Sequence, residues 1–289
     1  MILATHGVIA SQIQSYAFLL DTYTSAAAAY SLRKLRSAYT GSAIRVRRSS
    51  DNTETDIGFS SEFGLDTTAL SSFCGSGNGF VTTWYDQSGN GRNATQATAV
   101  NQPQIVSSGT VLLQGSKPIM QFLGSDFLRT VSTFSMGVNR SYTMTLFSAI
   151  NSNISFKGYL THTATNYSDN TLNGMLGRFD NSKFPVSYVS NGSTNTNVGN
   201  TPLTDNQYYL LNQLVQGSVQ HQMYRNGVLN AQNTSLAISP ENTARSLDVL
   251  FTAQTGNDLR TNEAIVWESY QSSNRTGIES NINTYYAIY

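Results

Sequence analysis

Few cysteine and histidine side chains are present to do nucleophilic or acid–base chemistry. The sequence holds one cysteine, Cys74, and three histidines, His6, His162 and His221. A lone cysteine cannot form an intramolecular disulfide, and a catalytic thiol needs a neighbouring base. We expect Cys74 to be a buried thiol rather than the nucleophile of a Cys–His site.

The segment Trp84–Gln96 is the richest in polar residues that could bind a ligand or form a turn. Five of its residues bond to nearby backbone amides or permit a positive φ: Asp86, Ser88, Asn90, Gly89 and Gly91. We predict a stiff turn that satisfies its own backbone. A calcium site is the alternative, but no dense acidic cluster supplies the six to eight oxygens that Ca²⁺ needs. No other cofactor is expected.

Charge and hydropathy limit the partners. Charged residues make up 12% of the chain, against roughly 25% in an ordinary soluble domain, and 17 basic residues balance 17 acidic ones. There is no net field to attract nucleic acid or an anionic membrane. No apolar run reaches the ~18 residues of a membrane-spanning helix. We expect a surface of uncharged polar residues, no nucleic-acid partner and no membrane insertion.

Residues 1–24 differ from the rest of the chain. They begin with a short apolar stretch without helical periodicity and without the basic start of a signal peptide. We predict an N-terminal arm that docks on another chain by strand addition, and a disordered or packed terminus is the equal alternative. Five residues would make the assembly contact: Ile2, Leu3, His6, Val8 and Ile9.

The remaining residues, 25–289, predict one all-β sandwich. Strands are expected near 104–106, 119–122, 142–149, 156–161, 174–179, 185–190, 207–216, 219–225, 228–232, 246–253 and 263–268. Asn226-Gly227 lies between two of them and predicts a tight hairpin.

Three helices are expected beside these strands. The alanine run in residues 26–35 predicts a brief helix, and Asp66 predicts an N-cap for a helical turn that extends to Phe73. A last helix opens near Ser272, with apolar residues on one face at Ile278, Ile282 and Tyr285.

Two segments carry a family resemblance. They are Ala29–Asp51, with Tyr-Ser-Leu-Arg-Lys-Leu and Thr-Gly-Ser-Ala-Ile-Arg-Val-Arg, and Trp84–Gly91, reading Trp-Tyr-Asp-Gln-Ser-Gly-Asn-Gly. Together they resemble the catalytic domain of the α-L-arabinofuranosidase B family, which implies a concanavalin A-like β-sandwich, or jelly roll. The C-terminal part of the chain, with its predicted Asn-Gly hairpin and last helix, is similar to the ending of laminin-G-like domains. Such domains also occur in bacteriophage fibre and tail proteins.

The resemblance implies a nucleophilic Glu in a Met-Glu-Ala-Ile-like context and an acid/base Asp after glycines. The nearest match to the first context, Gly174–Gly177, has Leu176 where the Glu would stand, whereas Gly256-Asn257-Asp258 matches the second. A lone acid cannot run a double displacement. The family's vicinal cysteine pair is also absent. We therefore expect no enzyme activity.

The leading functional expectation is a non-enzymatic structural protein of a bacteriophage virion. It would form a homo-oligomer, bind other virion proteins through the arm, and present a lectin-like domain on the capsid or tail surface. A host glycan would bind at Tyr167, Tyr188, Asp258 and Trp267. The alternative is an arabinofuranosidase-like glycoside hydrolase that acts on a surface polysaccharide through Asp258. A bacterial surface adhesin is a third hypothesis.

Overall fold

The computed structural model describes residues 17–148, 157–163, 173–179, 185–191, 195–199, 202–235, 242–249 and 258–289. Three α-helices and one 3-10 helix occur in this part of the chain: α1 (Leu19–Thr22), α2 (Thr67–Cys74), η1 (Ala99–Asn101) and α3 (Arg275–Tyr286). None of them is long and apolar enough to cross a membrane.

The strands of the first third are short. They are β1 (Ala26–Ser31), β2 (Ile44–Arg48), β3 (Glu54–Ile57), β4 (Gly79–Trp84), β5 (Ala94–Thr95), β6 (Gln104–Ser107), β7 (Thr110–Val111), β8 (Leu113–Gln114), β9 (Lys117–Pro118), β10 (Met120–Leu123) and β11 (Leu128–Thr130).

The later strands include the longest ones. They are β12 (Asn139–Ser148), β13 (Lys157–Thr163), β14 (Asn173–Phe179), β15 (Pro185–Asn191), β16 (Asn195–Val198), β17 (Gln207–Gln216), β18 (Gln220–Arg225), β19 (Val228–Asn233), β20 (Asp248–Val249), β21 (Asp258–Thr261) and β22 (Glu263–Trp267).

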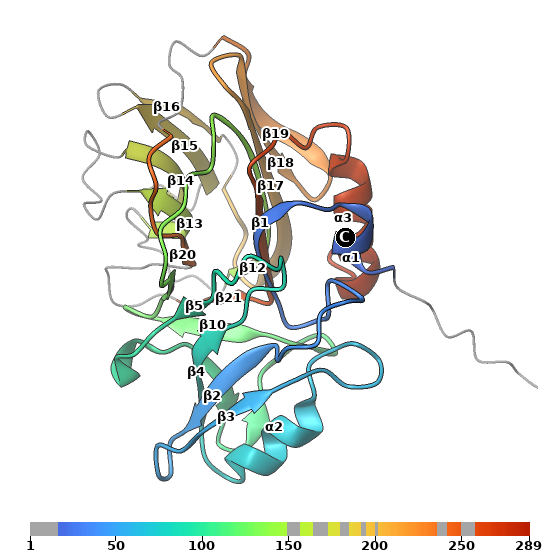
Figure 1. The fold of residues 1–289 in the computed structure, drawn as a ribbon, viewed down its shortest axis with the longest axis vertical. Helices are drawn as coiled ribbons and strands as arrows, with labels where there is room; N and C mark the ends of the chain where they lie inside the picture. Colours follow the sequence, from blue (N-terminus) through green and yellow to red (C-terminus); the bar gives the residue numbers. More distant parts are fainter. Residues whose placement is uncertain are drawn as a thin grey trace, which may run out of the picture.

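Hydrogen bonding joins nearly all of these strands into one curled sheet that folds over itself as a sandwich. One layer runs β1–β22–β12–β17–β18–β19, and the other runs β11–β20–β13–β14–β15–β16. Strands β2 to β6 and β10 close one end between them (Figure 1). The main core fills the space between the layers, and a second core lies where α1 and α3 cover the outer side of β1, β17 and β22. The predicted all-β sandwich with a C-terminal helix is confirmed.

Three local sequence patterns correctly predicted the structure: the Asn-Gly hairpin, the Asp66 helix cap and the last helix. Asn226 and Gly227 join β18 to β19 with positive φ at both residues (51° and 77°), as a type I′ hairpin requires. The Asp66 side chain accepts the Ala69 N–H at 2.9 Å and caps α2. The predicted last helix is α3, whose buried face includes Ile278 and Ile282.

The helix predicted over residues 26–35 is wrong, because residues Ala26–Ser31 form strand β1. All six residues are buried, since β1 lies between the two cores. Alanine side chains are small enough to pack on both faces at once, so tertiary packing overrides the helical propensity of the alanine run.

The described part of the predicted arm, residues 17–24, packs onto the sandwich. Leu19 and Leu20 of α1 are buried in the second core, and the Leu20 N–H bonds to the Leu35 carbonyl at 2.8 Å. Residues 1–16 lie outside the described residues. They include all five predicted assembly residues (Ile2, Leu3, His6, Val8 and Ile9), so the assembly contact stays a prediction.

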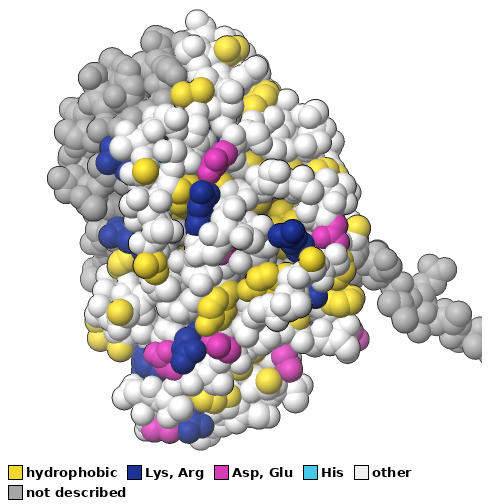
Figure 2. All heavy atoms as spheres, in the orientation of Figure 1, with side chains coloured by type: hydrophobic (Ala, Val, Ile, Leu, Met, Phe, Trp, Pro, Cys, Tyr) yellow, Lys and Arg dark blue, Asp and Glu magenta, His cyan; other side chains and the backbone are white. Residues whose placement is uncertain are grey.

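The surface agrees with the composition. Figure 2 shows a face made mostly of uncharged atoms, with few charged side chains. Basic and acidic side chains form ion pairs on the exposed surface of β2. Arg45 pairs with Glu54 at 2.8 Å and with Asp56 at 3.2 Å, and all three are exposed. Arg33 differs, because it is buried against Glu263.

The Trp84–Gln96 segment is the stiff turn that the sequence predicts. Asp86 is buried, and its two oxygens accept four bonds: Oδ1 from the N–H groups of Ala29 and Ser88, and Oδ2 from the Ser88 hydroxyl and the Arg92 N–H, all within 2.8–2.9 Å. Gly89 and Gly91 both have positive φ. Because protein donors occupy the Asp86 oxygens, a calcium ion would have to displace them. No group of three His, Cys, Asp or Glu side chains suited to a metal occurs among the described residues.

The turn also reaches across to the edge of β1 that no strand in the described part of the chain covers. Gln87, which is fully buried, accepts the Leu35 N–H and donates to the Ser31 and Arg33 carbonyls. The Asn90 amide donates to the carbonyls of Ala26 and Ala27 at 3.0 and 2.9 Å. Side chains of the turn therefore take the place of a neighbouring strand.

We predict that Asp86→Asn lowers the free energy of unfolding by about 2–4 kcal/mol, because the new NH₂ group must face a buried N–H donor. The measurement is urea unfolding followed by circular dichroism. Asp66→Asn is the matched control, with an expected change of a few tenths of a kcal/mol, since Asn and Asp cap helices about equally well. Equal effects of the two substitutions would contradict this role of Asp86.

Candidate functional site

The four residues predicted to bind a glycan do not form one site in the described structure. Tyr167 lies outside the described residues. Tyr188 is in β15, where its backbone pairs with Leu176 of β14 and Asn197 of β16, and its side chain is not described. Asp258 begins β21, and Trp267 ends β22.

Trp267 cannot stack on a sugar in this structure. It is fully buried in the second core, beneath α3. It also lies far from Asp258, because β12 pairs with both strands: Trp267 faces Ser141, whereas Leu259 faces Ser148. Seven residue steps along an extended strand span roughly 23 Å. The prediction that Trp267 lines a sugar site with Asp258 is therefore wrong.

Asp258 belongs to a polar cluster where β10 and β21 pair. Leu123 lies opposite Asp258 and Gln121 lies opposite Arg260, so all four side chains project from the same face of the sheet. Asp258 Oδ1 accepts Arg260 Nε at 2.9 Å, and Oδ2 accepts Arg260 Nη2 at 2.7 Å and Gln121 Nε2 at 2.8 Å. Asp258 and Arg260 are each about a quarter exposed, so solvent reaches this pair.

A second carboxyl group lies beside the same strand end. The chain turns after Leu123, and the Asp126 N–H bonds back to the Leu123 carbonyl at 3.0 Å. The Asp126 Oδ2 atom accepts the Leu123 N–H at 2.8 Å. Gly124, with a φ of 55°, permits the turn. Asp126 is only 8% exposed.

The two carboxyl groups have different environments. Burial raises the pKa of Asp126 to about 6, although its bond from the Leu123 N–H acts in the opposite direction. Asp258 is engaged as a carboxylate by Arg260, and its hydrogen bond raises the pKa of Arg260. One group can therefore hold a proton near neutral pH while the other is paired with a cation.

The register limits how far apart the two groups lie. Residues directly opposite in an antiparallel pair have Cα atoms about 4.5–5.5 Å apart. Because Asp126 contacts the backbone of Leu123 and Asp258 lies opposite it, the carboxyl groups are at most roughly 14 Å apart. Glycosidase carboxyl pairs operate at about 5–9.5 Å.

The sequence reading missed Asp126, Gln121 and Arg260. Asp126 stands in a Gly-Ser-Asp turn that has no catalytic signature. The alternation Asp258-Leu259-Arg260 could have predicted the pairing of Asp258 with Arg260, because residues two apart in a strand share a face.

Leu176 lies inside β14, where its backbone pairs with Thr161 and Tyr188. The other candidate groups are structural in the described part of the chain. Cys74 and His221 are buried, and His162 bonds to the Phe134 carbonyl at 2.6 Å. Burial lowers the pKa of His162 to about 4.

Comparison with known proteins supports the β-sandwich fold described above. The family described as "Alpha-L-arabinofuranosidase B, catalytic" matches residues 19–115. A probable α-L-arabinofuranosidase B of Aspergillus flavus is 40% identical over 97 residues, which are 32% of this chain and 19% of the relative.

Two solved structures resemble the whole sandwich. A GH54 α-L-arabinofuranosidase soaked with a cyclic sulfate inhibitor matches with a TM-score of 0.67 at 17% identity. An arabinofuranosidase in complex with arabinofuranosyl-α-1,2-xylobiose matches with a TM-score of 0.65 at 18% identity. Each match covers 91% of this chain and 64% of the other. This chain thus spans less than two thirds of these proteins, and identities this low show the fold alone.

These matches contradict the prediction of a non-enzymatic phage structural protein, because the matched family and relatives are glycoside hydrolases. Leu176 does not show that a nucleophile is missing, because a context of a few residues is too short to locate one. The resemblance to the arabinofuranosidase B catalytic domain is confirmed for residues 19–115. The predicted virion location, homo-oligomer and partners are not tested by these comparisons.

We predict that Asp126→Asn stabilises the protein at pH 8 by about 1–2 kcal/mol and leaves its stability at pH 4 nearly unchanged. The raised pKa means that the folded state keeps a proton which the unfolded state releases between pH ~4 and ~6. The wild type therefore loses stability as pH rises through this window, whereas Asn keeps the bond from the Leu123 N–H without the buried charge.

Urea unfolding of both proteins at several pH values measures this difference. Asp66→Asn, at an N-cap, controls for loss of an ordinary carboxylate. A gain for Asp126→Asn that is the same at pH 4 and pH 8 would refute the assignment.

Proposed function

We propose that this chain is a glycoside hydrolase that removes α-L-arabinofuranosyl groups from a polysaccharide. The observation that carries the proposal is the 40% identity to α-L-arabinofuranosidase B over 97 residues. The matched residues 19–115 contain β1 and the Asp86 turn, so the similarity includes the part of the chain on which the sandwich is built.

The chemistry needs two carboxyl groups with different tasks. One gives a proton to the glycosidic oxygen as its bond to the anomeric carbon breaks, and the other attacks that carbon or activates a water. In our assignment Asp126, with its raised pKa, is the proton donor. Asp258, already a carboxylate in its pair with Arg260, is the nucleophile or base.

This assignment differs from the acid/base role that the resemblance implied for Asp258. The reason is geometric. Both Asp258 oxygens already accept hydrogen bonds from Arg260, so this carboxyl would have to release a guanidinium before it could donate a proton. Asp126 Oδ2 accepts one backbone N–H, and no contact of Oδ1 is seen within the described part of the chain.

The substrate class follows from the relatives. One structural neighbour is in complex with an arabinofuranosyl group on xylobiose. An arabinose branch on a xylan-type backbone is therefore the first substrate to test for this chain.

We predict that the protein releases arabinose from 4-nitrophenyl α-L-arabinofuranoside and from arabinoxylan. Asp258→Asn and Asp126→Asn should each lower kcat/KM by about 10²-fold or more. Because the proton donor must be protonated, wild-type kcat/KM should fall about tenfold per pH unit above pH ~6.

Colorimetric assay and chromatography of released sugars measure the activity, with Asp66→Asn as the matched surface control. Full activity of Asp258→Asn, or no arabinose released from either substrate by folded wild type, would contradict the proposal.

A further inference from the structure

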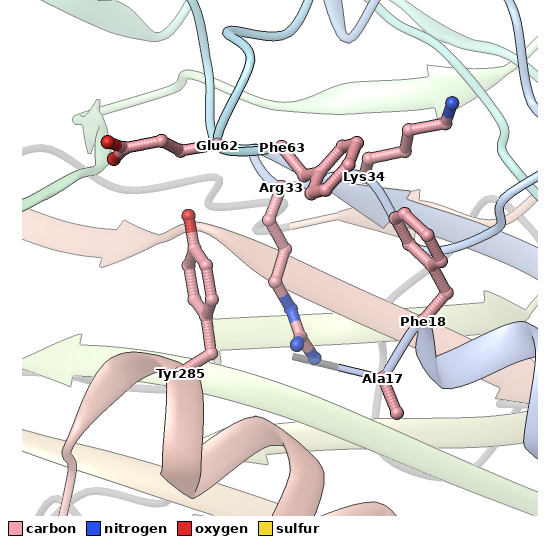
Figure 3. Close-up of a pocket in the computed structure, with 7 residues that line it drawn as sticks. All are labelled: Ala17, Phe18, Arg33, Lys34, Glu62, Phe63 and Tyr285. Atoms are coloured by element: carbon pink, nitrogen blue, oxygen red, sulfur yellow. The ribbon is translucent and has the colours of Figure 1, made fainter. Parts of the chain in front are cut away.

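A small pocket lies between the segment entering α1, the loop before Leu65 and the end of α3. Its lining residues are Ala17, Phe18, Arg33, Lys34, Glu62, Phe63 and Tyr285 (Figure 3). The cavity volume is about 10 Å³. That is room for roughly one water molecule, or for one oxygen of a larger group whose body stays outside.

A buried guanidinium forms one wall of this pocket. Arg33 is 97% buried, and it uses Nε and Nη2 to hold Glu263 at 2.7 and 2.9 Å. Its third terminal nitrogen, Nη1, has no hydrogen-bond partner among the described residues. Figure 3 shows the guanidinium end of Arg33 directed toward Ala17 at the pocket. A guanidinium nitrogen at a pocket favours an oxygen acceptor from outside.

An exposed aromatic ring stands at the mouth of the pocket. Phe63 is 47% exposed and has a φ of 63°, which is unfavourable for a bulky side chain. Its backbone is held there by the Lys34 N–H, which bonds to the Phe63 carbonyl at 2.7 Å. The ring meets Phe18 edge-on, with centroids 4.9 Å apart. A strained backbone that keeps a large apolar ring in solvent is typical of ligand sites.

The charge around the pocket is positive. Lys34 Nζ lies 5.8 Å from the Phe18 ring centroid, and Lys117 Nζ lies 3.9 Å from that of Tyr285. Glu263 accepts hydrogen bonds from Arg33, Ser31 and Tyr286, and Glu62 points away from the guanidinium in Figure 3. Burial, and then the neighbouring Arg33 charge, lower the pKa of Lys117. An anion in the pocket would relieve this crowding of cations.

We propose that the pocket binds the carboxylate of an acidic sugar residue, a uronate, whose ring packs on Phe63. One oxygen of the carboxylate is small enough to enter a cavity of this volume and to reach Arg33 Nη1. The sugar ring is too large to enter and lies over the exposed face of Phe63, as sugars do on aromatic side chains. Lys34 adds charge attraction at the rim. The proposal does not depend on the hydrolase activity, because it concerns binding alone.

Isothermal titration calorimetry with the full chain tests it, using three probes: tri-galacturonate, its neutral methyl ester, and acetate. We expect tri-galacturonate to bind at least tenfold more tightly than the ester, and more weakly as salt rises, because the carboxylate charge is recognised. Acetate should bind at least tenfold more weakly than tri-galacturonate, because it has no ring to pack on Phe63.

Two variants avoid the structural Arg33. Phe63→Asn keeps a residue that tolerates positive φ, and Lys34→Gln removes only the rim charge. Each should weaken tri-galacturonate binding about tenfold without lowering the melting temperature. Val131→Asn replaces a residue that is 77% exposed elsewhere, and it should leave binding unchanged.

Three results would overturn the proposal: no binding of tri-galacturonate, equal binding of the acid and its ester, or unchanged binding by both variants. Acetate binding as tightly as tri-galacturonate would also overturn it, because the site would then recognise any carboxylate rather than an acidic sugar.

Discussion

The uncovered edge of β1 is the constraint on which the rest of the sandwich depends. Strand β1 is buried on both faces and, among the strands of the described residues, pairs with β22 along one edge only. Buried backbone groups without partners are costly, so the second edge needs donors and acceptors. Asp86, Gln87 and Asn90 supply them from a turn that positive-φ glycines hold in shape. An ordinary strand there would continue the sheet, whereas this turn ends it.

The chain just after β1 connects this strand to β22 and to helix α3. Just after the strand, Arg33 is buried against Glu263 at the start of β22, and the hydroxyl of Tyr286 lies 3.2 Å from the same carboxylate. Burial of Arg33 disfavours its charge, but Glu263 more than compensates, so the net effect raises the pKa of Arg33. Such a pair adds little net stability compared with apolar packing, yet removing one partner costs about 3–5 kcal/mol. The Arg33–Glu263 pair therefore helps to fix the position of α3 through Tyr286, and it adds little to the stability of the protein.

Sequence patterns predicted the parts of the fold that local chemistry decides. The Asn226-Gly227 hairpin needs two positive φ values, and the Asp66 cap needs one side-chain oxygen, so both were visible in a few residues. The alanine strand β1 could not be predicted from a few residues, because its conformation is decided by two cores that form only in the folded chain. The prediction that Trp267 binds a glycan was wrong for the same reason. An aromatic ring can stack on a sugar, but whether the ring is buried depends on the whole fold.

The candidate carboxyl pair was hidden from the sequence for a related reason. Asp126 follows β10 and Asp258 begins β21, far apart in the chain, and the antiparallel register opposite Leu123 places both at the same end of this strand pair. Short motifs can report a nucleophile that sits in a fixed context, but they cannot report a pair assembled by strand pairing. The absence of a Glu at position 176 therefore says little about activity. In the proposed mechanism the two groups differ in their environments, because Asp126 is buried whereas Asp258 is paired with a guanidinium, and a sheet edge with its adjoining turn can hold both.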